Sequence, residues 1–174
     1  KETMEQFETQ LEESLNKAAT NEDAVKRVYE IKKRIDSKAL IVLVDKPVKV
    51  EFYVREVPEI AWNLIDVADK PLTIVYPNAR NLATNVLADD GSVGIRITQE
   101  TFSRKLCERF RKAIVSTSAN ISGQPAPTNF NEISDEIKQA VDYVVTYRQD
   151  DPYQPSPSSV IWIGEGGVIK ILRP

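Results

Sequence analysis

The chain is 174 residues long, 41% apolar and 28% charged, with a formal net charge of −3, which is enough apolar content for one buried core. It has no histidine and one cysteine, Cys107, which excludes histidine-based metal sites, a histidine general base and an intramolecular disulfide. The acidic balance argues against a broad nucleic-acid-binding surface, and no apolar run is long enough to cross a membrane. A lone cysteine suits a reducing compartment, so we expect a cytoplasmic protein without membrane contact.

The spacing of apolar residues predicts helices and strands that alternate along the chain. In chain order, the predicted elements are a helix at 4–15, a helix at 21–34, a strand at 40–44, a helix at 58–68, strands at 72–75 and 93–97, a helix at 99–111, a strand at 113–115, a short helix at 133–141, a strand at 143–145, a loop at 149–157, and a hairpin of strands 160–163 and 168–172. Thr20 or Asn21 can cap the second helix, and Val67 is expected on the inner face of the third. This order predicts a single α/β domain over residues 1–174, built on a mixed, twisted sheet.

A cluster of small polar residues follows the predicted strand at 113–115. Residues 116–123 read Ser-Thr-Ser-Ala-Asn-Ile-Ser-Gly, with five small polar side chains and a closing glycine. A loop of this kind at the end of a buried strand can direct hydroxyl, amide and backbone N–H groups onto one ligand. On spacing alone, an ordinary turn is the alternative interpretation.

A basic cluster stands at the predicted end of the second helix. Lys32 and Arg34 are separated by one residue, and two such side chains diverge on a continuing helix. They can converge only if the helix ends there, and the following Ile-Asp-Ser at 35–37 favours such an ending. The alternative is a solvated basic cluster that stabilises the helix C-terminus, a role that fits Lys33.

Six segments of the sequence resemble motifs of one family. The loop S-T-S-A-N-x-S-G is similar to the signature loop of YrdC-like domains, the threonylcarbamoyl-adenylate synthases. Five other motifs of this family have counterparts here in the family's order: the helix ending in K-x-R at 29–34, the P-L-T strand at 70–75, the V-G-x-R strand at 92–97, the P-S-T-V strand at 157–161 and the closing L-R-P at 171–174. The resemblance implies a YrdC-like fold, in which a twisted mixed β-sheet and its flanking helices surround a concave cavity.

One departure from the family pattern is large. The family places a strand and a loop with the wording P-T-D-T-x-Y-G between its first two helices, and this segment has no counterpart between about residues 18 and 20. Its absence would remove a central strand and part of the threonine site. We therefore hypothesise that the natural protein carries the segment, and an intact mass equal to that of the 174 residues would contradict this hypothesis.

The resemblance also implies an activity and its residues. The family condenses L-threonine, bicarbonate and ATP to threonylcarbamoyl-adenylate and pyrophosphate, the first step of N6-threonylcarbamoyladenosine formation in tRNA, so we expect Mg²⁺ with ATP and a downstream threonylcarbamoyl transferase complex as a partner. The catalytic residues implied are Lys32, Arg34, Ser118 and Asn120. Residues implied in binding ATP or threonine are Thr73, Arg96, Thr117, Ser122, Ser158 and Arg173. No metal site built from protein side chains is expected.

Two other functions remain open at this stage. YciO-like proteins resemble this fold but depart from the K-x-R and S-T-S-A-N wording, which this chain retains. An RNA-binding or ribosome-maturation module that recognises tRNA or double-stranded RNA is the third interpretation, and the acidic net charge weighs against it.

Overall fold

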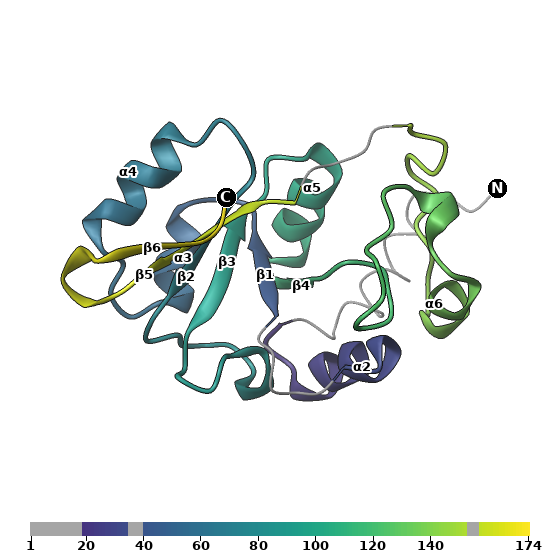
Figure 1. The fold of residues 1–174 in the computed structure, drawn as a ribbon. Coiled ribbons are helices and arrows are strands. Elements are labelled where there is room, and N and C mark those ends of the chain that lie inside the picture. The colour runs from purple at the N-terminus through teal and green to yellow at the C-terminus, as the bar shows by residue number, and fades with distance from the viewer. Residues whose placement is uncertain (1–18, 35–39, 153–156) are drawn as a thin grey trace.

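The computed structural model describes residues 19–34, 40–152 and 157–174 (Figure 1). The helix predicted at residues 4–15 lies outside these ranges. Among the described residues, the central element is a six-stranded sheet in the order β4-β1-β3-β2-β5-β6. Its strands are β1 (Ile41–Val44), β2 (Leu72–Tyr76), β3 (Val93–Ile97), β4 (Ile114–Ser116), β5 (Ser159–Ile163) and β6 (Ile169–Arg173).

The sheet is mixed, as predicted. β1 pairs with β3 and β2 pairs with β5 in parallel, whereas the other three pairings are antiparallel. The register sets Thr73 of β2 opposite Arg96 of β3. Because side chains alternate along a strand, this pair shares one face of the sheet, and the apolar residues beside it point to the other face.

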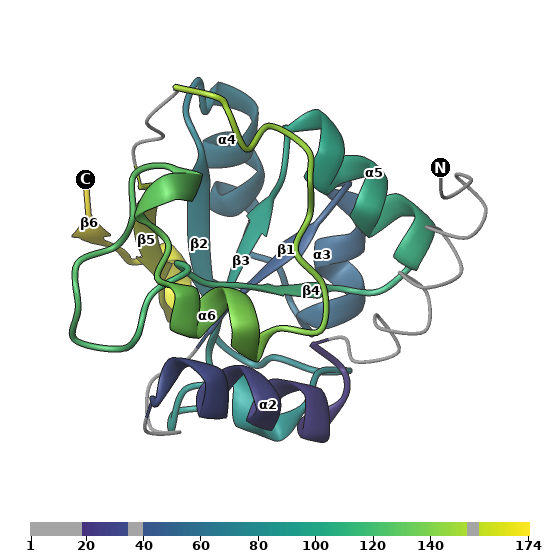
Figure 2. The ribbon, with the colours of Figure 1, turned by 90° about the vertical axis from the view of Figure 1, so that its right-hand side faces the viewer.

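Helices flank the sheet at both ends of its strands. They are α2 (Glu22–Lys32), α3 (Val48–Tyr53), α4 (Glu59–Val67), α5 (Thr101–Phe110) and α6 (Asp135–Ala140), with short 3-10 turns at Thr84–Val86, Phe130–Glu132 and Glu165–Gly167. In Figures 1 and 2, α4 and α5 lie toward one end of the strands and α2 toward the other. The buried core joins β1, β2 and β3 to α2, α3 and α4.

The second helix begins and ends where the sequence predicts. Asn21 caps α2, because its side chain accepts a hydrogen bond from the Ala24 N–H. At the other end Lys33 adopts a left-handed conformation with φ of 49°, and its N–H bonds back to the last helical turn. The helix therefore stops between Lys32 and Arg34.

Four details of the sequence prediction are wrong. Residues 143–145 are not a strand, because the segment after α6 lies along α5 through side-chain contacts and has no strand partner. The strand at 113–115 is only half buried, since β4 is an edge strand. Val67 is 76% exposed at the last position of α4, a helix with only Ala61 fully buried. The short helix α3 was not predicted, because six residues are too few to display a helical period.

Candidate functional site

The side chain of Lys32 holds the polar loop at 116–123 in place. Lys32 is 5% exposed, and its ammonium donates to the backbone oxygens of Ser118 (2.5 Å) and Asn120 (2.7 Å) and to Asn120 Oδ1 (3.3 Å). A lysine has three N–H donors, and each has an acceptor here. Lys32 therefore binds the loop itself, and its side chain meets another ligand only by exchanging one of these oxygens.

Asn120 closes the loop from within. Its amide nitrogen donates to the backbone oxygens of Ile121 (3.1 Å) and Gln124 (2.7 Å), while its amide oxygen accepts from Lys32. The Ser122 N–H donates to the Lys32 backbone oxygen at 2.8 Å, which fastens the loop to the end of α2 a second time. With Lys32 and Asn120 occupied in this way, the loop presents the side chains of Thr117, Ser118 and Ser122 to solvent.

Arg34 lies beside this junction, as the ending of the helix allows. Its backbone N–H donates to the Tyr29 oxygen, and its guanidinium lies 5.9 Å from the centre of the Tyr29 ring. Burial and, to a smaller degree, the positive charge of Arg34 lower the pKa of Lys32. Lys33, between them, forms an ion pair with Glu136 at the surface, which is the solvated role predicted for it.

A second polar cluster lies on the sheet. Thr73 (0% exposed) and Ser158 (3% exposed) bring their hydroxyl oxygens to 2.9 Å from each other. Arg173 donates through Nε to the Ser158 backbone oxygen at 2.8 Å and through Nη2 to Ser158 Oγ at 3.3 Å. Strand pairing brings these three residues together: β2 runs beside β5, and β5 beside β6.

Arg96 connects the two clusters. Its Nη2 donates to Ser116 Oγ at 3.3 Å, and Ser116 ends β4 where the polar loop begins. Burial lowers the pKa of Arg96, and the positive charge of Arg173 lowers it further. Sequence reasoning did not select Ser116, although its position as the first residue of the S-T-S-A-N run was an available signal.

The charges of the site are not neutralised. Lys32, Arg96 and Arg173 have no carboxylate within ion-pair distance among the described residues, although the chain as a whole is acidic. Two of these three cations, Lys32 and Arg96, contact the hydroxyl-rich loop at 116–123. Such a site is suited to an anion with several oxygens. The part of the chain that the structure describes holds no group of three or more cysteine or carboxylate side chains that could bind a metal ion.

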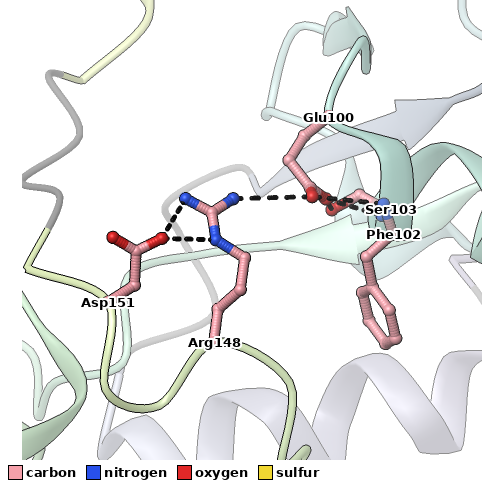
Figure 3. A network of polar contacts seen from close by, with 5 residues as sticks. All are labelled: Glu100, Phe102, Ser103, Arg148 and Asp151. Carbon is pink, nitrogen blue, oxygen red and sulfur yellow. Dashed lines mark hydrogen bonds and ion pairs between the residues drawn. The ribbon is translucent and has the colours of Figure 1, made fainter.

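A segment between α6 and β5 is fastened to the start of α5 (Figure 3). Arg148 donates to Asp151 through Nε (2.6 Å) and forms an ion pair with Glu100 (3.7 Å). Glu100 also caps α5 by accepting from the N–H groups of Phe102 and Ser103. The Phe102 and Tyr147 rings stack at 5.3 Å. Figure 2 shows this segment, residues 143–151, passing in front of the sheet; we call it the strap.

Sequence and structure comparisons show the family and the fold of the chain. The family model Sua5_yciO_yrdC, described as Telomere recombination, matches residues 15–174. A Methanocaldococcus jannaschii protein, provisionally named threonylcarbamoyl-AMP synthase, is 35% identical over 154 residues, which are 88% of this chain and 70% of that protein. The threonylcarbamoyl-AMP synthase of Pyrococcus abyssi is 29% identical over 140 residues, 80% of this chain and 41% of that protein.

Among solved structures, P. abyssi Sua5 complexed with L-threonine matches with a TM-score of 0.78 and 27% identity over 90% of this chain. The match covers 46% of the Sua5 chain, so this chain spans about half the length of that protein. The chain belongs to the Sua5/YciO/YrdC family. Its mixed sheet with flanking helices is the YrdC-like fold predicted from the motifs.

The structure assembles the predicted residues into two neighbouring groups. The first contains Lys32, Thr117, Ser118, Asn120 and Ser122, with Arg34 beside it; the second contains Thr73, Arg96, Ser158 and Arg173. Which of them meet a substrate stays a prediction, as does the absence of the P-T-D-T segment between about residues 18 and 20. No helix among the described residues has the length and apolar character needed to span a membrane.

Proposed function

We propose that this chain is an L-threonylcarbamoyladenylate synthase, a nucleotidyltransferase that converts L-threonine, bicarbonate and ATP to threonylcarbamoyl-AMP and pyrophosphate. Membership of the family supports this function, as does the name of the P. abyssi relative. The observation that carries the proposal is a set of three cations, Lys32, Arg96 and Arg173, beside a loop of exposed hydroxyls. None of the three has a carboxylate partner in the part of the chain that the structure describes.

The reaction needs fixed positive charge and no protein nucleophile. The amine of threonine and bicarbonate form a carbamate with loss of water. A carbamate oxygen then attacks the α-phosphorus of ATP, and pyrophosphate leaves as the bond to the β-phosphate oxygen breaks. An anion attacking a polyanion meets electrostatic repulsion, so preorganised cations and N–H donors lower the barrier. A chain without histidine can perform this chemistry.

The contacts divide the site residues into two roles. Lys32 and Asn120 have their polar groups occupied by the loop, so we propose that they position it and that Lys32 adds its charge to the local field. The exposed hydroxyls of Thr117, Ser118 and Ser122 are free of that task and are proposed to contact substrate oxygens.

On the sheet, Arg96 and Arg173 are proposed to hold phosphate or carboxylate oxygens, as is Arg34 at the helix end. The planar guanidinium fork suits paired oxygens of this kind. Thr73 and Ser158 are buried against each other, and Ser158 accepts from Arg173, so both are proposed to orient that arginine toward the substrate.

Magnesium is proposed to enter with ATP. Because the described residues offer no carboxylate cluster, its ligands would be phosphate oxygens, water and the hydroxyls of Thr117 or Ser118, a set of hard oxygen donors that suits Mg²⁺. Bound there, the ion would neutralise charge on the leaving pyrophosphate.

A mixed anhydride of a carbamate and a phosphate is reactive toward water and amines. We therefore propose a threonylcarbamoyl transferase acting on tRNA as the partner that consumes the product. Direct contact of this chain with tRNA or double-stranded RNA is a separate proposal, and the site cations are its natural location.

The test is pyrophosphate release from ATP, measured with and without L-threonine and bicarbonate. We expect release that requires both. A protein carrying the P-T-D-T segment should be assayed beside the 174-residue chain, since that segment is proposed to complete the threonine site. Release independent of both co-substrates, or none from either protein, would favour a YciO-like role. Tight, salt-dependent and ATP-independent retention of structured RNA on a filter would favour the RNA-binding module instead.

A further inference from the structure

A second cavity lies on the face of the sheet opposite the candidate site. It has a volume of about 480 Å³ and is enclosed by α4, β2, β3 and the start of α5. Its strand residues include Leu72, Ile74 and Tyr76, which alternate along β2 with Thr73 of the candidate site. Because alternating side chains point to opposite faces, these cavity residues lie across the sheet from Thr73, while Arg96 of the candidate site also borders the cavity.

The cavity has an apolar floor and a polar mouth. Ile74, Tyr76 and Ile95 form buried walls, while the exposed residues Lys70 and Gln99 stand at its edge. The volume falls in the range of about 300–1,000 Å³ that is common for small-molecule sites. Such a lining accepts an apolar body of limited size.

The mouth shows no excess of one charge. The lining holds two cations, Lys70 and Arg96, and two carboxylates, Asp69 and Glu100. Glu100 is also engaged by Arg148 and by the N-terminus of α5. An ionic ligand would gain little electrostatic binding free energy from these balanced charges, so the cavity favours an uncharged molecule.

One polar group in the wall, the hydroxyl of Tyr76, forms no hydrogen bond among the described residues. Tyr76 as a whole is 1% exposed. Burial raises the pKa of Tyr76 well above its ordinary value, so the hydroxyl stays protonated and can donate. The hydroxyl oxygen is not one of the fully enclosed atoms that lack a partner, so it borders open space, and the cavity that Tyr76 lines is the space in which an acceptor can lie.

We propose that this cavity binds a small, uncharged, mainly apolar molecule whose carbonyl or hydroxyl oxygen accepts a hydrogen bond from Tyr76. The assignment does not depend on the activity proposed above. Of the cations of the candidate site, Arg96 also borders this cavity, whereas Lys32 and Arg173 do not line it.

Two probes of similar shape test the proposal. Acetophenone carries a carbonyl acceptor, and ethylbenzene lacks one. Each is titrated into the isotope-labelled full chain, with amide chemical shifts of β2, β3 and residues 98–103 as the readout. We expect saturable shifts there with both probes, and an affinity for acetophenone at least about fivefold higher, as one buried hydrogen bond provides. Absence of saturable shifts at these residues up to the solubility limit overturns the proposal.

Three variants locate the contact. Tyr76→Phe should lower the affinity for acetophenone to that for ethylbenzene and leave the latter unchanged. Ala68→Phe fills the cavity wall and should abolish binding of both probes. Tyr147→Phe, a matched loss of a hydroxyl on the strap outside the cavity, should change neither affinity.

Thermal unfolding of each variant shows whether it is folded. Selectivity for acetophenone that survives in folded Tyr76→Phe, or binding that survives in Ala68→Phe, overturns the assignment. If Tyr76→Phe does not fold, the Ala68→Phe result and the preference of the unmodified chain for acetophenone decide the question.

Discussion

The two halves of the candidate site are held in different ways. The loop at 116–123 has its shape fixed by a cation, because Lys32 gathers three oxygens from two of its residues. The cluster of Thr73, Ser158 and Arg173 is fixed by strand register, and its side-chain bonds follow from where β2, β5 and β6 already lie. A substitution should therefore disorder the first half but only remove a contact from the second.

Replacing the cation should have the largest effect. In Lys32→Ala, the backbone oxygens of Ser118 and Asn120 lose their donor, so both the loop geometry and a positive charge are lost. We expect turnover to fall by about 10³-fold, as for loss of a preorganised electrostatic group, and the free energy of unfolding to fall by about 2 kcal/mol. Pyrophosphate release and urea unfolding measure the two effects.

The adjacent Lys33→Ala is the matched control. Lys33 has the same charge but forms only a surface ion pair with Glu136, so both quantities should stay near those of the unmodified chain. If Lys32→Ala lost turnover while retaining full stability, Lys32 would be a substrate ligand only, and the distinction between the two halves would disappear.

Removing the cation Arg96 from the sheet should weaken ATP binding without lowering the stability of the fold. Arg96→Met keeps much of the apolar stem and removes a half-buried charge that lies near the positive charge of Arg173. We expect the KM for ATP to rise by about 10- to 100-fold, the loss of one charge-assisted contact or two, with thermal stability unchanged or slightly higher. A fall in stability comparable to that of Lys32→Ala would show that Arg96 holds β4 through Ser116.

Local sequence signals predicted the fold well where the chain itself supplies the cause. Asn21 as a cap and the helix stop beside Lys33 depend on neighbouring residues, and both are confirmed. The strand at 143–145 was wrong because its apolar pattern had no partner strand in space. Pairing is decided by tertiary structure, which periodicity does not contain.

The same distinction between local and tertiary causes applies to the candidate site. Motif wording selected the loop and the cations, but not the contact from Arg96 to Ser116, which arises from residues 20 positions apart on strands β3 and β4. Nor could spacing show that the ammonium of Lys32 is fully occupied, because two of its three acceptors are backbone oxygens that any sequence would provide. The motifs predicted which side chains belong to the site, but they could not predict hydrogen bonds accepted by backbone oxygens.

The buried hydroxyl pair offers a smaller and more local test. Thr73→Val and Ser158→Ala each remove the bond between the two hydroxyls, so each should lower the free energy of unfolding by about 1–2 kcal/mol. The smaller loss is expected for Thr73→Val, because Ser158 Oγ still accepts from Arg173. Because the same contact is removed twice, the double variant should lose less than the sum of the two single variants. Urea unfolding of the four proteins measures the coupling, and strict additivity would show that the hydroxyls do not interact.

The smallest effect is expected for the strap. Like the loop, it is held by a charged group, but its ion pair between Arg148 and Glu100 lies at the surface. Burial acts to raise the pKa of Glu100, yet hydrogen bonds from Ser103 and Phe102 and the charge of Arg148 outweigh it and keep the pKa below its ordinary value. A carboxylate with a depressed pKa stabilises the folded state above its unfolded pKa, and that contribution is lost as the pH falls through the folded value.

Lowering the pH below about 4.5, the ordinary value for glutamate, should therefore loosen the strap. The loop should keep its geometry, because Lys32 stays charged in acid, and so should the neutral hydroxyls of Thr73 and Ser158. Amide chemical shifts of residues 145–151 should move with one transition that Glu100→Gln abolishes. Equal movement at residues 116–123 would mean that strap and loop are coupled, and that the loop depends on more than the lysine beneath it.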